Sequence, residues 1–218
     1  YKNIMSSQYE GDVVMESEAG PGQGRMERKK QELRKKIITV AMNLFERQGF
    51  GTTTMEQIAE EADIARKTLY NYFPVKEAIA DEYVRDVSRG LAEKTFETLG
   101  RLPDTRTRLL EALNNAYGWV EVNPEITGVV LAYRFKTSYQ AGKKLEPTGT
   151  ETVMAEIIRR GQQSGEIEPG ISAELMVLYL DMLRGTMVME WLKNPSGVKL
   201  GDRIAQLVDM VLYGISTR

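Results

Sequence analysis

The side chains with the clearest chemical potential lie between positions 66 and 72, in the segment RKTLYNY. On a helix, the side chains that share the outward face of this segment are Arg66, Lys67, Tyr70 and Asn71. Arginine and lysine can bond guanine edges or phosphates, asparagine can bond adenine, and a tyrosine ring can pack on a thymine methyl group. This face suits the major groove of duplex DNA, although an ordinary surface helix with two cations is the alternative.

Two hydroxyl groups and a further cation border this face. Thr68 and Tyr72 lie at its edges, where hydroxyl groups can reach phosphates. Lys76 lies near the start of the next helix, where backbone N–H groups also favour an anion. These positions predict contacts with the DNA backbone.

A short amphipathic helix is expected directly before this segment. Its apolar residues recur with helical spacing at Met55, Ile58, Ala59 and Ala62. Thr53 and Thr54 can each cap its start. Glu56 or Gln57, three residues later, can close a capping box.

A tight turn is expected to join the two short helices. Asp63 and Ile64 form this turn, because aspartate tolerates the unusual backbone angles that a turn requires. The second helix then runs from about 65 to 72, and Pro74 ends it because proline lacks an N–H and restricts Phe73. Two short helices with a tight turn form a helix-turn-helix, a reader of duplex DNA.

The residues from 49 to 77 resemble the signature of the tetracycline-repressor (TetR) family of transcriptional regulators. The matching residues are Gly49, Phe50, Thr53, Thr54, Met55, Ile58, Ala59, Ala62, Thr68, Leu69, Tyr70, Tyr72, Phe73, Pro74, Lys76 and Glu77. The resemblance covers about residues 28 to 80. It implies phosphate contacts from Thr54, Tyr72 and Lys76, and groove contacts from Arg66, Lys67, Thr68, Tyr70 and Asn71.

Three positions depart from the family pattern. Asp63 stands where the family usually has glycine, and Lys67 stands where glycine is common. Ala65 stands where a serine commonly caps the recognition helix. We therefore expect Asp63 to supply the cap instead, and Lys67 to add a DNA contact.

The remaining chain is predicted to be helical throughout, because no strand-like alternation competes with the helical spacing. A strong helix is expected over 27–48, ended by Gly49, and a long one over 75–99. Further helices are expected over 104–121, 124–140, 148–164, 172–193 and 200–215. The fold class is therefore all-α, with an N-terminal three-helix helix-turn-helix DNA-binding domain and a C-terminal helical domain for ligand binding and dimerisation.

The domain boundaries follow from composition and from the helix pattern. Residues 1–24 are turn-rich and are expected to be a flexible or artificial extension, with Met26 as the natural start. Residues 25–74 are expected to form the DNA-binding domain, and residues 75–218 the ligand-binding and dimerisation domain.

The net charge of −2 hides a local excess of cations, because residues 25–80 carry 11 Lys and Arg against eight acids. DNA association needs such a local positive surface rather than a basic chain.

Aromatic and thioether side chains in the second domain could line a small-molecule pocket, and the resemblance implies such a pocket without indicating a ligand class. The candidates are Tyr117, Trp119, Tyr133, Phe135, Met154, Tyr179 and Met182. Each could equally be an ordinary core residue. Arg134 lies in an otherwise apolar run and could meet an anionic ligand, form an ion pair or extend its charged end to the surface.

The last two predicted helices carry apolar stripes that could form an oligomer surface. The candidate interface residues are Leu178, Gly185, Met189, Leu207, Val211 and Ile215. Gly185 would let two helices approach closely, whereas packing within the subunit is the alternative for every member of the set. The resemblance implies a two-fold four-helix interface, which would match a palindromic operator with half-sites about 34–36 Å apart, or a multiple of that distance.

Several function classes are disfavoured by residue types. The chain has no histidine and no cysteine, so it lacks the commonest general base and the thiolate nucleophile. No phosphate-binding loop and no metal-ligand spacing is evident, so we expect no enzyme, no cofactor and no metal site. No run of 18 apolar residues and no signal peptide is present, so we expect a cytoplasmic protein without a membrane partner.

These observations predict a ligand-responsive, homodimeric transcriptional regulator, which by resemblance is most often a repressor. Its partners would be a palindromic operator in double-stranded DNA and a small-molecule effector. Two alternatives remain open. The chain could be a small-molecule-binding helical module whose DNA-binding role is lost, or a helical adaptor that binds only proteins.

Overall fold

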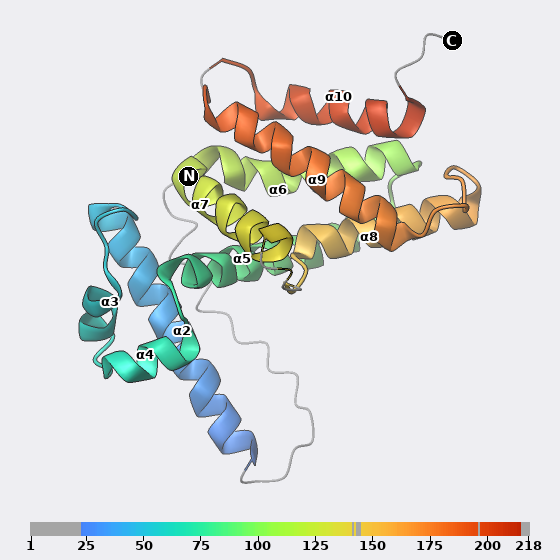
Figure 1. Ribbon diagram of the computed structural model, residues 1–218. Helices are drawn as coiled ribbons and strands as arrows, with labels where there is room; N and C mark the ends of the chain where they lie inside the picture. The colour runs from blue at the N-terminus through green and yellow to red at the C-terminus, as the bar shows by residue number, and fades with distance from the viewer. Residues whose placement is uncertain (1–22, 141, 143–144, 196, 215–218) are drawn as a thin grey trace. The chain divides into compact units, whose positions relative to one another are not determined.

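The computed structural model describes residues 23–140, 142, 145–195 and 197–214, and every regular element in these ranges is helical (Figure 1). In chain order the elements are α2 (Gln23–Gln48), α3 (Met55–Glu61), α4 (Arg66–Tyr72), α5 (Lys76–Leu99), α6 (Thr105–Val122), α7 (Pro124–Phe135), the π-helical turn η1 (Lys136–Gln140), α8 (Gly149–Ser164), α9 (Ala173–Leu192) and α10 (Leu200–Tyr213). The all-α prediction is therefore confirmed, and the expected helix over 124–140 differs in that its last five residues wind as a π-helix.

The chain divides into two compact units, residues 1–36 and residues 37–218. In the first unit, α2 begins at Gln23, four residues before the predicted start. Its exposed surface carries the pairs Arg28–Glu32 at 3.8 Å and Lys30–Glu27 at 4.0 Å. Such exposed pairs contribute little stability. The predicted extension over 1–24 lies almost entirely outside the described residues.

The second unit begins with a small helical head, formed by the part of α2 from Ile37 onward together with α3 and α4. Its apolar core comprises Ile37, Ile38, Ala41, Leu44, Phe45, Phe50, Met55, Ile58, Ala59, Ala62, Leu69 and Phe73. Gly49 ends α2 with a φ of 87°, and its N–H bonds the carbonyl of Phe45 at 2.9 Å. A positive φ carries little steric cost for glycine, so the predicted helix end is confirmed.

The start of α3 is fixed by the capping box expected from the sequence. Thr54 is the N-cap, and its hydroxyl accepts from the N–H of Gln57 at 3.2 Å. The Gln57 side chain in turn accepts from the N–H of Thr54 at 2.9 Å. Thr53 is buried and donates its hydroxyl to the carbonyl of Gly49 at 2.9 Å. The cap is therefore Thr54, and Thr53 stabilises the preceding turn.

The rest of the second unit is a helical body arranged around the long helix α5 (Figure 1). Helices α6, α7 and α8 pack against α5, α9 packs against α7 and α8, and α10 packs against α6 and α9. At 24 residues, α5 is about 36 Å long. The apolar core of the body includes Leu99, Leu109, Leu113, Met154, Ile157, Ile158, Leu200, Ile204 and Val208.

A glycine allows α8 to begin directly against α5. A Cβ atom at Gly149 would lie 2.1 Å from the carbonyl oxygen of Ser88, so any larger residue would collide with the α5 backbone. The Ser88 hydroxyl accepts from the N–H of Thr150 at 3.0 Å and so binds one of the free amides of the first turn of α8. None of the described helices combines the length and the apolar character that crossing a membrane requires.

Candidate nucleic-acid interface and effector cavity

Helix α4 presents the predicted DNA-contacting face to solvent. Leu69 is fully buried in the head, whereas the four side chains expected to face outward are exposed, namely Arg66, Lys67, Tyr70 and Asn71. Thr68 and Tyr72 are half-buried at the edges of this face. The face therefore has the donors and the exposure needed to enter a groove.

The turn before α4 is formed as expected, but the cap of α4 is not. Asp63 has a φ of 52°, which confirms its place in the left-handed turn. The N-cap residue of α4 is Ala65, and no side chain caps the helix. The expectation that Asp63 supplies the cap is therefore wrong, because the left-handed residue lies two positions before the N-cap. The first N–H groups of α4 are left without a side-chain partner, and such groups favour an anion.

Lys76, a predicted phosphate contact, already has three partners inside the head. Its ammonium lies 2.6 Å from the carbonyl oxygen of Phe50, 2.8 Å from that of Thr53 and 3.3 Å from that of Gly51. The same nitrogen lies 4.4 Å from the centre of the Phe50 ring. An ammonium has three protons, so these three carbonyls use its donor capacity. The structure places Lys76 as the residue that holds the loop between α2 and α3.

Two adjoining cavities open in the helical body. The larger has a volume of about 640 Å³ and lies between α7, η1, α8 and α9, with apolar walls and the carboxylates of Glu151 and Asp181. The smaller has a volume of about 90 Å³ and is lined by residues of α5, α6, α7, α8 and α9, with Ser88 and Arg184 among its polar groups. Leu131 and Arg134 line both cavities. The larger volume falls in the range of small-molecule sites.

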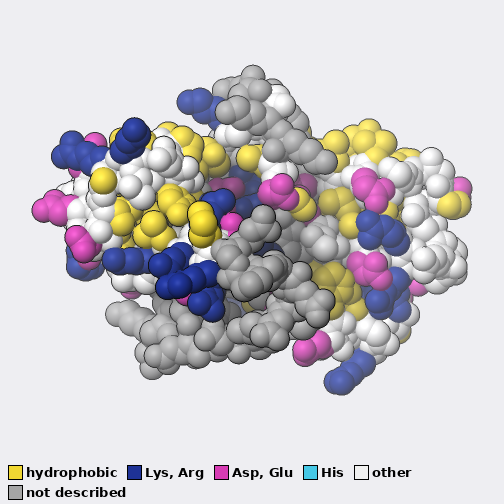
Figure 2. All heavy atoms as spheres, turned by 90° about the horizontal axis from the view of Figure 1, so that it is seen from below, with side chains coloured by type: hydrophobic (Ala, Val, Ile, Leu, Met, Phe, Trp, Pro, Cys, Tyr) yellow, Lys and Arg dark blue, Asp and Glu magenta, His cyan; other side chains and the backbone are white. Residues whose placement is uncertain are grey.

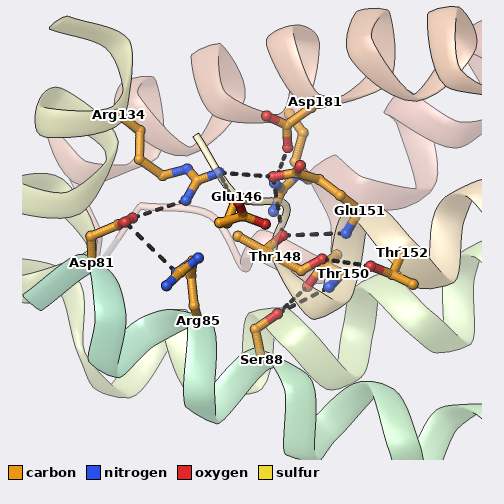
Figure 3. Close-up of polar contacts among 11 residues, drawn as sticks. Asp81, Arg85, Ser88, Arg134, Glu146, Thr148, Thr150, Glu151, Thr152 and Asp181 are labelled. Atoms are coloured by element: carbon orange, nitrogen blue, oxygen red, sulfur yellow. Dashed lines mark hydrogen bonds and ion pairs between the residues drawn. The ribbon is translucent and has the colours of Figure 1, made fainter. Parts of the chain in front are cut away.

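Arg134 joins α5, α7 and α8 through a partly buried set of charges (Figure 3). One guanidinium nitrogen donates to Asp81 of α5 at 2.9 Å. The other lies 3.0 Å from the carbonyl oxygen of Glu146 and 3.4 Å from Glu151 of α8. Arg85 extends the set, because it lies 3.9 Å from Asp81 and also pairs with Glu82. Of the options that the sequence left open for Arg134, the ion pair is the one observed.

Burial shifts the proton equilibria of groups beside the cavities. Burial, and then the nearby Asp181 carboxylate, raise the pKa of Glu151 above its ordinary value. Burial also raises the pKa of Tyr117 to about 12. Although burial opposes the charge of Arg184, the paired Asp181 carboxylate raises the pKa of that guanidinium further. Arg184 therefore stays charged, whereas the charged form of Glu151 is disfavoured relative to a carboxylate in water.

The predicted pocket residues separate into three groups. Trp119 lines the smaller cavity, and Phe135 and Met182 line the larger one. Tyr117 and Met154 are buried in the core of the body and line neither cavity. Tyr133 is half-buried and Tyr179 is 54% exposed, and neither lines a cavity.

Three of the six predicted interface residues are exposed, and Leu178, Gly185 and Met189 also line the larger cavity. Leu178, Met189 and Val211 are 49%, 44% and 40% exposed, and Gly185 has open space beside it. Leu207 is instead 7% exposed and packs inside the subunit, so its assignment to an interface is corrected. Ile215 lies outside the described residues. Further apolar side chains on the same two helices are exposed, including Leu175, Tyr179, Leu183, Met210 and Tyr213.

Sequence reasoning missed the residues that connect the head to the body. The N–H of Phe50 donates to the carboxylate of Glu125, in the first turn of α7, at 3.3 Å. Arg134 likewise bonds two distant carboxylates, that of Asp81, 53 positions away in the sequence, and that of Glu151, 17 positions away. An acid in the first turn of a helix is common, so Glu125 gave no signal of a distant partner. The buried Asp81 could have been noticed as an acid on the inward side of α5.

The comparisons with known proteins agree on the head and extend through the body. Residues 37–83 match the family model described as bacterial regulatory proteins of the tetR family. The chain is 25% identical over 194 residues to YdgC of Bacillus subtilis strain 168, an uncharacterized HTH-type transcriptional regulator, covering 87% of this chain and 96% of YdgC. It is 24% identical to the HTH-type transcriptional repressor KstR2 of Rhodococcus jostii strain RHA1, covering 84% and 91% of the two chains.

The fold is also similar to solved structures. Thermus thermophilus FadR, a TetR-family transcriptional repressor solved with lauroyl-CoA, superposes with a TM-score of 0.73 at 23% identity, over 85% of this chain and 96% of FadR. Bacillus subtilis FadR, solved with stearoyl-CoA, superposes with a TM-score of 0.58 at 18% identity, over 83% and 98%. The family match over the helix-turn-helix, together with relatives that extend along most of the chain, supports a DNA-binding transcriptional regulator of the TetR family.

Proposed function

We propose that this protein is a homodimeric repressor that binds a palindromic operator in the cytoplasm and leaves it when a small molecule occupies the cavity of the body. The observation that carries the DNA-binding part is the exposure of Arg66, Lys67, Tyr70 and Asn71 around a buried Leu69. Groove contacts are assigned to these four residues and to Thr68. Phosphate contacts are assigned to Thr54 and Tyr72.

The cavity of about 640 Å³ supports the effector part of the proposal. Its walls combine Leu131, Phe135 and Met182 with the carboxylate of Glu151 and the guanidinium of Arg134. Such a mixture of apolar surface and a few polar groups is typical of sites for small organic ligands. The FadR structures contain lauroyl-CoA and stearoyl-CoA, so lauroyl-CoA is a reasonable first probe for this chain.

The exposed apolar side chains of α9 and α10 support the dimer. Leu178, Met189 and Val211 would lose contact with water in a two-fold interface, which favours association. Two copies would then hold their α4 helices at a fixed spacing, and a half-site separation of about 34–36 Å or a multiple would match it. An effector that prefers a different spacing weakens operator binding, and DNA weakens effector binding equally.

The test is selection of bound sequences from a random DNA pool, with and without cell metabolites. The proposal expects a palindromic consensus whose recovery falls when metabolites, or lauroyl-CoA, are added. A variant with Arg66→Ala, Tyr70→Ala and Asn71→Ala should bind the selected operator no better than random DNA. Salt-dependent binding without a consensus would favour a ligand-binding module that has lost its operator. No DNA binding at low salt would favour a protein-only adaptor.

A further inference from the structure

The larger cavity of the body combines apolar walls with a pair of carboxylates. Its apolar lining includes Leu131, Phe135, Leu145, Leu178, Met182 and Met189. The carboxylates of Glu151, from α8, and Asp181, from α9, lie next to each other in this lining (Figure 3). Two further charged residues of the lining, Lys136 and Glu190, are exposed and opposite in sign. The enclosed charge of the cavity therefore comes from Glu151, Asp181 and Arg134.

The partly buried charges around this pair include more acids than bases. None of their side chains is exposed, and the set consists of four acids and three arginines, namely Asp81, Glu82, Glu151, Asp181, Arg85, Arg134 and Arg184. On the outer surface, by contrast, side chains of both signs lie interspersed on the face drawn in Figure 2, where water and salt screen them. Charges held away from water are screened much less, so the excess negative charge of the set is costly.

Within this set, Glu151 is the acid that lacks an arginine of its own. Each guanidinium makes its shortest contact with another acid, in the pairs Arg85–Glu82, Arg134–Asp81 and Arg184–Asp181. Glu151 lies farther from its nearest guanidinium, at 3.4 Å from Arg134. Burial, and then the neighbouring Asp181 carboxylate, raise the pKa of Glu151. A positive group beside Glu151 would therefore balance the charge of the set.

The chemistry of the lining indicates which ligand charge fits the larger cavity. An ammonium beside Glu151 supplies the positive charge and donates charge-assisted hydrogen bonds to carboxylate oxygens. Phe135 lines the same cavity, and the face of an aromatic ring also attracts a cation. A carboxylate or phosphate in the same place would instead lie beside two groups of like charge. The lining therefore favours a cation with an apolar body over an anion.

We propose that the ligand of the larger cavity is an apolar amine whose ammonium binds the carboxylates of Glu151 and Asp181. Its apolar part lies against Leu131, Phe135 and Met182, and the volume of about 640 Å³ accommodates a small organic molecule. This inference rests on the proposed function, because it names the chemical class of the effector.

Three probes with chains of the same length and different head groups separate the charge from the apolar contact. The probes are octylammonium, octan-1-ol and octanoate, and isothermal titration calorimetry of the full chain without DNA measures their affinities. Octylammonium is expected to bind about tenfold to a hundredfold more tightly than octan-1-ol, the range for a hydrogen bond between charged groups. Octanoate is expected to bind more weakly than octan-1-ol, because its charge has the sign of Glu151 and Asp181.

Removal of single carboxylates locates the ammonium. Glu151→Gln keeps the shape of the side chain and removes its charge, so octylammonium should lose about tenfold in affinity while octan-1-ol binds as it does to the wild type. Asp181→Asn should act in the same direction, and thermal unfolding checks that the protein stays folded once Arg184 has lost its partner. Glu190→Gln, at an exposed position of the same cavity, is the matched control and should change neither affinity.

The outcomes distinguish this ligand class from the proposed function. Octanoate that binds as tightly as octylammonium, no binding of any probe, or an unchanged octylammonium affinity in Glu151→Gln would each overturn the amine. The proposed function would stand in all three cases if the wild type selects a palindromic operator that a cell metabolite releases. Tight octylammonium binding that leaves the selected operator bound would instead contradict the effector role of the cavity and keep its ligand class.

Discussion

The ammonium of Lys76 and the carbonyl oxygen of Phe50 lie 2.6 Å apart, so the first residue of α5 is bonded directly to the loop that precedes α3. Phe50 and Thr53 both lie in this loop, and Lys76 also binds the carbonyl of Thr53 at 2.8 Å. The N-terminal end of the longest helix of the body is thereby fixed to the head.

Replacement of Lys76 distinguishes a structural role from a phosphate contact. Lys76→Ala leaves the carbonyls of Phe50 and Thr53 without their partner, so operator affinity should fall while the salt dependence stays that of the wild type. Arg66→Ala, at an exposed position of α4, should instead reduce the slope of log K against log salt by about 1. Fluorescence anisotropy over a salt series measures both slopes. A reduced slope for Lys76→Ala would instead indicate that Lys76 contacts a phosphate.

The sequence preference of the protein should depend on Tyr70 and Asn71. Both side chains are exposed on α4, and we expect Tyr70→Ala and Asn71→Ala each to lose about 1–3 kcal/mol of discrimination between the operator and its single-base variants. Thr54→Ala should weaken binding to all sequences alike, since Thr54 caps α3 and is a proposed phosphate contact. Competition with mismatched operators measures the difference. An unchanged ranking of mismatches would remove these two residues from groove contact.

The uncapped recognition helix offers a stabilising substitution. Ala65 is the N-cap of α4 and no side chain caps the helix, so Ala65→Ser should raise the free energy of unfolding by about 0.5–2 kcal/mol. Ala132→Ser, at an exposed position inside α7, places the same side chain where it caps nothing and should not stabilise. Urea unfolding of the two variants gives the comparison. Equal stability would mean that the amides of α4 already have adequate partners.

The raised pKa of Glu151 predicts a pH-dependent stability. A carboxyl whose pKa is higher in the folded state is favoured in its protonated form, so its contribution is present at low pH and is lost as pH rises through that raised pKa. Glu151→Gln should therefore be more stable than the wild type at pH 7. The gap should close as pH falls toward the ordinary value of 4.5. Denaturant unfolding at several pH values, with Glu97→Gln as the charge control, measures this gap; a constant gap contradicts the prediction.

Introducing a charge on α9 should separate the subunits of the proposed dimer. Leu178 is 49% exposed within the subunit, so Leu178→Glu should leave the fold intact. A buried charge at a two-fold interface disfavours association, and sedimentation at micromolar concentration should show monomers with weakened operator binding. Val122→Glu, at a 65% exposed position of α6, is the matched control and should remain dimeric. Dimers of both variants would place the interface elsewhere.

The helices and the DNA-binding face follow from local sequence. Gly49, Thr54 with Gln57, Asp63 and Pro74 mark the ends of the head helices, and each acts within a few residues of itself. The outward face of α4 is determined by the helical spacing of its residues and by one buried leucine. The same local logic gives the helix starts in the body, because α6, α8 and α9 begin after the N-cap residues Asp104, Thr148 and Ser172.

Only the tertiary structure decided which side chains from distant helices meet. The sequence alone left open whether Arg134 binds a ligand, an acid or water. Because α5 and α8 pack beside α7, its guanidinium bonds Asp81 and Glu151. Leu207 and Val211 share a helical stripe, yet one packs inward and the other is exposed. The carboxylate of Glu125 accepts from the N–H of Phe50, which lies 75 positions away in the sequence. Helix periodicity fixes which residues lie on a common side, whereas the neighbour on that side depends on the arrangement of the other helices.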